Sequence, residues 1–186
     1  KDNTLKKLKK IKGIKVVAHK KNQGKGSAIR TGIKKASGDI ILIQDADLEY
    51  DPKDYKKLIE LIIKGKAKVV YGSRRLDMSN KKYSGLSFYL GGIFLTMLTN
   101  ILYGTKITDE PTCYKVFKSE ILKSIPLKCT RFEFCPEVTA KIAKRKIDIY
   151  EVPIHYYPRS VKEGKKIKLK DGIDAIWTLI KYRFVD

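Results

Sequence analysis

The chain has few of the residues that build disulfide frameworks or histidine-rich metal sites. Its 186 residues include three cysteines, Cys113, Cys129 and Cys135, and two histidines, His19 and His155. The cysteine count is odd and no pair has the CxxC spacing, which argues against a disulfide scaffold and a structural zinc site. Unpaired cysteines are typical of a reducing compartment, and no signal-peptide pattern opens the sequence. We therefore expect a cytoplasmic location.

Acidic residues are also scarce. The chain has 20 Asp and Glu against 41 Lys and Arg, which gives a formal net charge of +21. This balance predicts affinity for anions: nucleic acid, an acidic membrane leaflet or a phosphorylated substrate. A lysine-rich or thermophilic proteome would produce the same balance through solvated lysines. Because the bases are spread along the chain and an acidic cluster interrupts them, a nucleic-acid partner is not expected.

Long hydrophobic runs are nearly missing. Residues 86–103 carry no charge, but they include glycines, threonines and an asparagine. Their number is at the lower limit for crossing a bilayer. We expect a buried or interfacial helix here rather than a membrane span.

What the sequence does have is an alternation of strand and helix patterns. β-branched or continuous apolar runs predict strands, and apolar residues at helical spacing predict helices between them. Such alternation is typical of a parallel, doubly wound α/β sheet, here in one domain over residues 1–186. The expected strands are 14–18, 40–44, 68–71 and 147–154, and the expected helices are 27–36, one starting at Pro52 with Asp51 as its cap, 86–103, 136–146 and 172–184.

An acidic cluster follows the second expected strand. Asp45, Asp47 and Glu49 alternate along Gln44–Glu49, so Asp45 and Asp47 project to the same side of an extended chain. Three neighbouring acids repel one another unless a cation joins them, and carboxylate oxygens suit Mg²⁺ or Mn²⁺. Open α/β sheets bind ligands at this end of their strands. The alternative is a solvated turn before the Asp51 helix cap.

Three basic segments are candidates for binding an anion. Asn22–Gly26 is a glycine-rich loop before a helix, where Lys25 and the backbone at Gly26 favour an anion. Arg74 follows a strand in Gly72–Arg75 and can hold phosphate with two hydrogen bonds. Arg159, Lys165 and Lys166 form a further basic group. Each segment has a plain alternative: a flexible turn, a surface cap or a solvated loop.

Taken in order, these motifs resemble glycosyltransferase family 2, and within it the dolichyl- and polyprenyl-phosphate sugar synthases such as dolichol-phosphate mannosyltransferase. The resemblance runs from Asp2 to the end of the chain. Asp2-Asn3-Thr4 looks like the tail of the family's DDGS-x-DNT segment. The matching segments that follow are 22–26 (NQGKG), 38–39 (GD), 44–52 (QDADLEYDP), 72–74 (GSR), 112–117 (TCYKVF), 132–137 (FEFCPE), 151–154 (EVPI), Arg159 and 163–167 (EGKKI).

The resemblance implies a fold and a set of roles. The fold would be the glycosyltransferase A fold, a Rossmann-like, mainly parallel sheet with helices on both faces. Asp45 would lie near the nucleotide ribose and the metal, with Asp47 and Glu49 as metal ligands. Arg74, Arg131 and Arg159 would contact the sugar diphosphate or the acceptor phosphate, and Lys165 and Lys166 would lie on a loop that closes over the site. The family's first strand and helix would precede Lys1, so the chain would be a fragment, inactive as it stands.

The implied reaction is the transfer of a hexose, with inversion, from a GDP-mannose- or UDP-glucose-type donor to a polyprenyl or dolichyl phosphate. We expect a peripheral enzyme at the cytoplasmic face of an anionic membrane, with an integral-membrane partner or a second copy of the chain. A first alternative is a family 2 enzyme acting on a sugar hydroxyl. That reaction requires a base, for which Asp109 and Glu110 are the candidates. A second alternative is a non-catalytic basic binding module.

Overall fold

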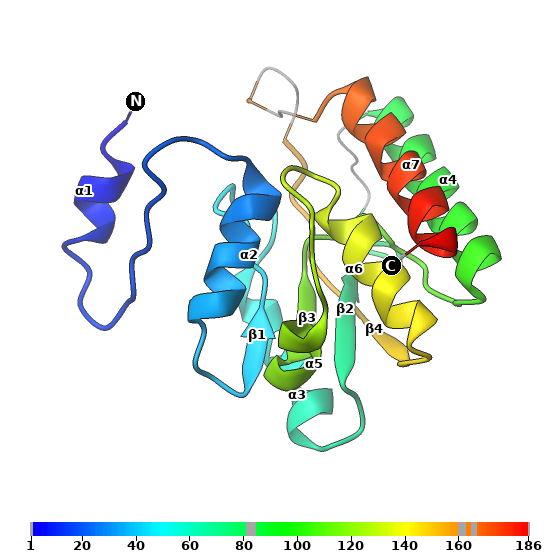
Figure 1. Ribbon diagram of the computed structural model, residues 1–186, viewed down its shortest axis with the longest axis horizontal. Helices are drawn as coiled ribbons and strands as arrows, with labels where there is room; N and C mark the ends of the chain where they lie inside the picture. Colours follow the sequence, from blue (N-terminus) through cyan, green and yellow to red (C-terminus); the bar gives the residue numbers. More distant parts are fainter. Residues whose placement is uncertain (1, 81–84, 160–162, 165–166, 186) are drawn as a thin grey trace.

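A four-stranded sheet forms the centre of the protein. The computed structural model describes residues 2–80, 85–159, 163–164 and 167–185. The strands are β1 (Ile40–Leu42), β2 (Val69–Ser73), β3 (Lys115–Lys118) and β4 (Ile149–Pro153), in the spatial order β1-β3-β2-β4. The helices are α1 (Thr4–Leu8), α2 (Lys25–Lys35), the 3₁₀ turn η1 (Pro52–Asp54), α3 (Tyr55–Ile63), α4 (Leu86–Tyr103), α5 (Ser119–Ser124), α6 (Phe134–Lys144) and α7 (Leu169–Phe184) (Figure 1).

The sheet is mixed rather than mainly parallel, which corrects the sequence-based expectation. β3 runs antiparallel to both of its neighbours, β1 and β2, while β2 and β4 are parallel. The sequence patterns predict no strand at Lys115–Lys118, although most of this segment belongs to the TCYKVF motif at residues 112–117. The long connection through α4 brings the chain back to the sheet in the opposite direction, so no simple strand–helix–strand crossover applies to β3.

The strand predicted at residues 14–18 is absent from the described structure. These residues are extended, and Ile14 and Val17 are exposed. β-branched residues favour a strand when they can pack against a neighbouring strand and a covering layer. Within the described part of the chain, this segment pairs with no strand. Figure 1 shows α1 set apart from the sheet, joined to α2 by this long segment.

Helices cover both faces of the sheet, as expected. Side chains alternate along a strand, so Val69 and Tyr71 enter one core and Val70 enters the other. The first core also contains residues of α2, α5 and α6, such as Leu122 and Val138, and the second contains Leu58 of α3. The predicted helix start at Asp51 is confirmed, because its side chain accepts a hydrogen bond from the Lys53 amide at 2.9 Å.

Two long helices, α4 and α7, lie side by side at one edge of the molecule (Figure 1). The helix predicted at 86–103 is confirmed in its bounds. Of the two expected settings, buried or interfacial, the buried one does not hold, since only Gly92, Thr96 and Thr99 of this helix are buried. By length and composition, this helix could cross a membrane. On α7, the side chains of Ile173 and Trp177 are exposed.

Candidate active site

A cavity of about 460 Å³ opens where the acidic loop, the loop after β2 and the start of α7 meet. β1 leads into the acidic loop, and β2 ends at Ser73, just before Arg74. This placement agrees with the rule that ligands bind beyond the carboxyl ends of strands in α/β sheets. The cavity is lined by Lys25, Asp45, Asp47, Glu49, Tyr50, Arg74, Glu110, Cys113, Phe132, Cys135, Tyr156 and Arg159, among others.

The three predicted acids all line this cavity, and lysine and arginine neutralise them. Asp45 Oδ2 lies 2.6 Å from Lys25 Nζ. Arg159 binds the other two: its Nη2 lies 2.8 Å from Asp47 Oδ2, and its Nε lies 3.2 Å from Glu49 Oε1. Leu48, between them, has a left-handed backbone with φ of 63°, which is uncommon for a branched residue. The backbone turn at Leu48 lets Asp47 and Glu49 reach one guanidinium.

The chemical type of the three acids suits a divalent cation, but in this structure Asp47 and Glu49 are bound to Arg159. Carboxylate oxygens are the ligands that Mg²⁺ and Mn²⁺ prefer, and all three acids reach one cavity. Across the residues that the structure describes, no three acids, cysteines or histidines are grouped closely enough to hold a metal ion. A cation would have to replace Arg159 on Asp47 and Glu49. In this structure Arg159 supplies the positive charge that a metal would bring.

Two residues of the glycine-rich loop, Lys25 and Gly26, have different roles: the first makes a polar contact and the second packs against a neighbouring loop. Lys25 begins α2 and points its amine at Asp45. Burial disfavours the charge on this amine, but Cys113, Cys135 and Asp45 outweigh burial and raise the pKa of Lys25. The amide of Gly26 donates to the Arg131 carbonyl oxygen at 2.9 Å, and the residue packs against the backbone of Thr130 and Arg131. Gly26 therefore holds α2 against the neighbouring loop.

Arg74 is fixed by a buried carboxylate. Its Nε and Nη2 each lie 2.7 Å from an oxygen of Asp109, and its amide donates to the same side chain at 2.9 Å. Burial opposes ionisation of Asp109, but the charge and hydrogen bonds of Arg74 outweigh it and keep the pKa of Asp109 below its usual value. Arg74 also lies 5.0 Å from the centre of the Tyr156 ring. Asp109 thus positions Arg74 rather than facing the cavity.

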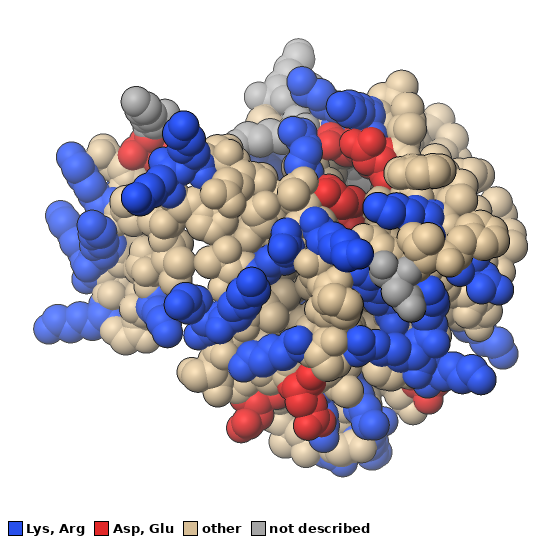
Figure 2. Space-filling view, in the orientation of Figure 1, with Lys and Arg blue, Asp and Glu red and all other residues tan. Residues whose placement is uncertain are grey.

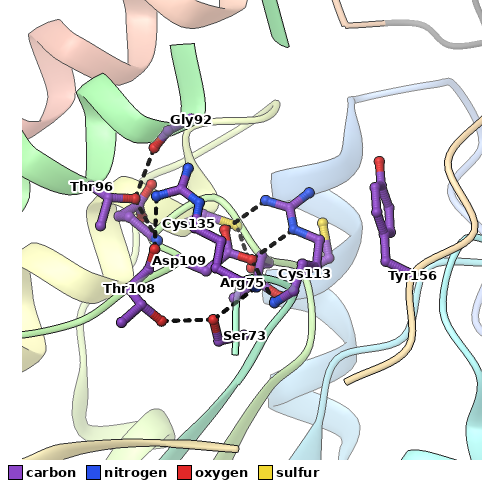
Figure 3. A network of polar contacts seen from close by, with 12 residues as sticks. Ser73, Arg75, Gly92, Thr96, Thr108, Asp109, Cys113, Cys135 and Tyr156 are labelled. Carbon is purple, nitrogen blue, oxygen red and sulfur yellow. Dashed lines mark hydrogen bonds and ion pairs between the residues drawn. The ribbon is translucent and has the colours of Figure 1, made fainter. Parts of the chain in front are cut away.

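Around this pair, further contacts fix the loop that carries Asp109 (Figure 3). Glu151 of β4 accepts hydrogen bonds from the amides of Thr108 and Asp109, at 2.7 and 3.1 Å. Arg75 donates to the Thr108 carbonyl oxygen at 2.8 Å. The hydroxyl groups of Ser73 and Thr108 are hydrogen-bonded to each other at 2.7 Å. The loop between α4 and β3 is therefore tied both to the end of β2 and to β4.

The carboxyl group of Glu110, next to Asp109, is only partly hydrogen-bonded within the described part of the chain. Its side chain is fully buried and lines the cavity. Oε1 accepts a hydrogen bond from Thr139 at 3.3 Å, whereas Oε2 has no hydrogen-bond partner in the described part of the chain. Burial raises the pKa of Glu110, although the charge of Lys115 opposes this effect. A carboxyl group with a raised pKa in a cavity is typical of functional sites.

The remaining predicted residues lie elsewhere. Arg131 is outside this cavity, with 63% of its side chain exposed, and it approaches Asp171 at 3.6 Å. Lys165 and Lys166 fall outside the described residues, although Gly164 and Ile167, which flank them, line the cavity. Sequence reasoning did not single out Tyr156 or Phe132 for this site. Neither residue belongs to a pattern of charge or spacing that would reveal it.

A second cavity of about 450 Å³ adjoins the first. Arg74, Arg75 and Tyr156 lie at one part of its wall, and Arg74 and Tyr156 line both cavities. The rest of its wall comes mainly from apolar residues of α4 and from the start of α7, including Phe88, Leu95 and Leu169. The second cavity therefore joins two arginines to an apolar surface between two helices.

A mixed α/β sheet with an acid- and cation-lined cavity beyond its strands defines an enzyme of the nucleotide-binding type. Residues 1–125 match the family model described as glycosyl transferase family 2. The chain belongs to this family and is a glycosyltransferase. This membership rules out the non-catalytic binding module.

Two curated relatives and one solved structure illustrate the similarity. The chain is 32% identical to the UDP-N-acetylglucosamine–dolichyl-phosphate N-acetylglucosaminyltransferase of Methanococcus voltae, over 91% of this chain and 76% of the relative. It is 28% identical to the dolichol-phosphate mannosyltransferase of Pyrococcus furiosus, over 82% of this chain and 43% of the relative. Glucosyl-3-phosphoglycerate synthase from Mycobacterium tuberculosis, solved with Mn²⁺, UDP-glucose and phosphoglyceric acid, superimposes with a TM-score of 0.64 at 17% identity, over 93% of this chain and 57% of that one.

The structural likeness identifies the glycosyltransferase A fold, with its mixed sheet between helices, and so confirms the predicted fold apart from the direction of β3. The chain spans less than half the length of the Pyrococcus relative and little more than half of the solved structure.

Proposed function

We propose that this site serves hexosyl transfer from a nucleotide sugar to a polyprenyl or dolichyl phosphate. The observation that carries this proposal is the pair of adjoining cavities that share Arg74 and Tyr156. The first cavity has the charged groups that a sugar diphosphate needs. The second has arginines for a phosphate and an apolar wall for a hydrocarbon chain.

The names of the relatives support both substrates. One relative is named for UDP-N-acetylglucosamine and dolichyl phosphate, and another for dolichol phosphate and mannose. The donor would accordingly be of the UDP-hexose or GDP-mannose type. In the first cavity, Lys25 and Arg159 would bind the diphosphate, and Asp45 would bind the ribose.

The residues of the chain would act by placing charge. A divalent cation on Asp47 and Glu49, with Asp45 near it, would neutralise the leaving diphosphate. Arg159, displaced from the acids, would contact the same diphosphate, and Arg74 would orient the acceptor phosphate toward the anomeric carbon. A phosphate monoester has a second pKa of about 6, so it is a nucleophile at neutral pH without a protein base. Direct displacement inverts the anomeric configuration.

Arg131, Gly26, Lys165 and Lys166 stay predictions for contacts with the substrates. The location would be peripheral, at the cytoplasmic face of a membrane. The exposed side chains of Leu90, Phe94, Met97 and Ile101 on α4, together with Ile173 and Trp177 on α7, provide an apolar surface beside the acceptor cavity. We refer to these six residues as the α4–α7 apolar face. Docking of this face on lipid would bring the second cavity to its acceptor.

A second candidate reaction, transfer to a sugar hydroxyl, is favoured by one observation. Glu110 is buried in the first cavity with an unpartnered oxygen and a raised pKa, as a general base would be. If the acceptor is a hydroxyl, Glu110→Gln should lower the rate by roughly 10²–10⁴-fold with donor binding preserved. If the acceptor is a phosphate, the loss should be far smaller.

The proposal is tested with a panel of UDP- and GDP-hexoses and a short polyprenyl phosphate, with and without Mn²⁺. Product formation should depend on both substrates. In calorimetric titrations, Asp47→Asn should lose the part of donor affinity that depends on Mn²⁺, because one carboxylate ligand is removed. Glu60→Gln, which alters an exposed pair with Lys64, is the matched control. Unchanged Mn²⁺-dependent affinity in Asp47→Asn would contradict the metal assignment.

A further inference from the structure

Two cysteines meet in the wall of the first cavity. Cys113 lies in the loop before β3, and Cys135 lies in the first turn of α6. Cys135 Sγ lies 3.5 Å from the carbonyl oxygen of Thr112, the residue before Cys113, so the two thiol groups are close enough to influence each other's ionisation. Both side chains line the cavity, and Figure 3 shows them in one network of polar contacts. The chain thus brings two thiols together at a site that the proposed reaction does not use.

A lysine touches this thiol pair. Lys25 Nζ lies 3.1 Å from Cys113 Sγ, while it also binds Asp45. The thiolate is the reactive form of cysteine. The interaction with Cys135 and burial raise the pKa of Cys113, although the charge of Lys25 opposes them. The hydrogen bond from Cys113 lowers the pKa of Cys135, burial opposes this, and the charges of Lys115 and Lys25 lower the pKa further. The pair therefore gives up its first proton more readily than an isolated buried thiol.

The third cysteine shows the contrast. Cys129 is buried, and burial together with the nearby charge of Glu137 raises the pKa of its thiol. It lines neither the first nor the second cavity. Cys129 therefore provides an internal reference for an unreactive cysteine.

We propose that Cys113 and Cys135 form a redox-sensitive dithiol, which a small disulfide such as oxidised glutathione converts into an intramolecular disulfide that weakens donor binding. The effect on donor binding rests on the proposed function, whereas the formation of the disulfide does not. Cys135 is the attacking residue, because its side chain lines the cavity and its pKa is lowered, whereas the pKa of Cys113 is raised.

The chemistry takes two exchange steps. The Cys135 thiolate attacks one sulfur of oxidised glutathione, forms a mixed disulfide and releases one glutathione thiolate. Cys113 then loses its proton, attacks the Cys135 sulfur and releases the second glutathione thiolate. The two protons lost by the cysteines are taken up by the two released thiolates. Two protein thiols are oxidised, and one external disulfide is reduced to two molecules of glutathione.

The bond would change the donor site in two ways. The bond would weaken the contact between Cys113 Sγ and the Lys25 amine, which also binds Asp45. The loop of Cys113 also carries Asp109, which holds Arg74, and the Cys113 amide donates a hydrogen bond to the Tyr50 hydroxyl oxygen at 3.3 Å. Drawing Cys113 toward α6 therefore moves groups that border the donor on more than one side.

The experiment exposes the reduced protein to graded ratios of reduced and oxidised glutathione. Oxidation should remove two of its three free thiols without adding glutathione to the mass. A tryptic digest should join the peptides of Cys113 and Cys135. Calorimetric affinity for the nucleotide sugar should fall by roughly tenfold, or about 1.4 kcal/mol, and dithiothreitol should restore it.

Three variants sharpen the test. Cys129→Ser should form the disulfide as the wild type does, leaving no free thiol. Cys113→Ser and Cys135→Ser should form no internal disulfide, and oxidation should leave their donor affinity unchanged apart from any glutathione adduct seen by mass. A wild type that keeps three thiols under oxidising conditions, or a bond that uses Cys129, would overturn the assignment.

The remaining outcomes separate the two proposals. A Cys113–Cys135 disulfide with unchanged donor affinity would overturn the claim that the bond controls the site. A reduced protein that binds no nucleotide sugar would count against the proposed function. The mass and the thiol count would still decide whether the dithiol forms its bond.

Discussion

At the scale of single residues, the buried pair of Arg74 and Asp109 should contribute strongly to stability. Asp109 is fully buried and holds Arg74 through three hydrogen bonds. Asp109→Asn removes the negative charge and leaves the guanidinium without its counter-ion. Removing one partner of a buried ion pair costs about 3–5 kcal/mol of the free energy of unfolding.

Urea denaturation measures this loss. Glu60→Gln is the matched control, because the pair of Glu60 and Lys64 is exposed and such pairs contribute about 1 kcal/mol or less. Equal stability changes in the two variants would show that Asp109 does not act as a buried counter-ion.

Glu110 makes a prediction about pH. Its pKa is raised above the usual 4.5 by burial, so the folded state binds this proton more tightly than the unfolded state. Its contribution to stability is complete below pH 4.5 and is lost as the pH rises through the raised pKa. In Glu110→Gln this fall should be missing. The measurement is the difference between the unfolding free energies of the wild type and the variant from pH 4 upward. A difference that does not change with pH would mean that Glu110 ionises normally.

At the scale of elements, α2 contains two glycines in different surroundings. A Cβ at Gly26 would lie 2.9 Å from the Arg131 carbonyl oxygen, whereas a Cβ at Gly32 would meet nothing within 4 Å. Gly26→Ala should therefore destabilise the protein by about 1–3 kcal/mol, because backbone must move. Gly32→Ala should stabilise it by up to about 1 kcal/mol through helix propensity. Thermal melts of both variants test the packing of α2. The same sign of change in both would contradict it.

Elements with a local signal could be predicted from the sequence. Asp51 and Pro52 mark a helix start by their own chemistry, and Gly104, with φ of 67°, ends α4 in the left-handed cap typical of glycine. Asp45, Asp47 and Glu49 were found because they are close in sequence. These features depend on neighbouring residues alone, so the full fold was not required to find them.

Features set by distant contacts could not be predicted in this way. The direction of β3 depends on the path of the chain through α4, which strand patterns do not encode. The exposure of Ile173 and Trp177 on α7 could not be predicted either, because the periodicity of apolar residues does not distinguish a protein core from another apolar environment. Arg159 was expected at the diphosphate, and its binding to Asp47 and Glu49 depends on the three-dimensional fold.

At the scale of the whole molecule, Lys and Arg are spread over the visible surface rather than gathered in one patch (Figure 2). Together with the α4–α7 apolar face, this charge predicts binding to anionic vesicles, at about 1 kcal/mol per base near the surface. Co-sedimentation should weaken as salt rises, because the Debye length falls. Trp177→Ser should weaken binding further at constant charge, since its exposed ring is part of the apolar face. Equal binding to neutral and anionic vesicles would contradict the electrostatic part.

The combination of the +21 charge with the α4–α7 apolar face has a consequence for the protein free of lipid. Between two copies, the charge acts as a colloidal barrier, which keeps the apolar faces apart while its range is about 10 Å at 0.1 M salt. At 1 M salt that range shrinks to about 3 Å, whereas apolar attraction is not screened. Concentrated salt should therefore release the protein from vesicles and at the same time promote its self-association. Static light scattering across a salt series measures the second effect as a second virial coefficient that turns from positive to negative.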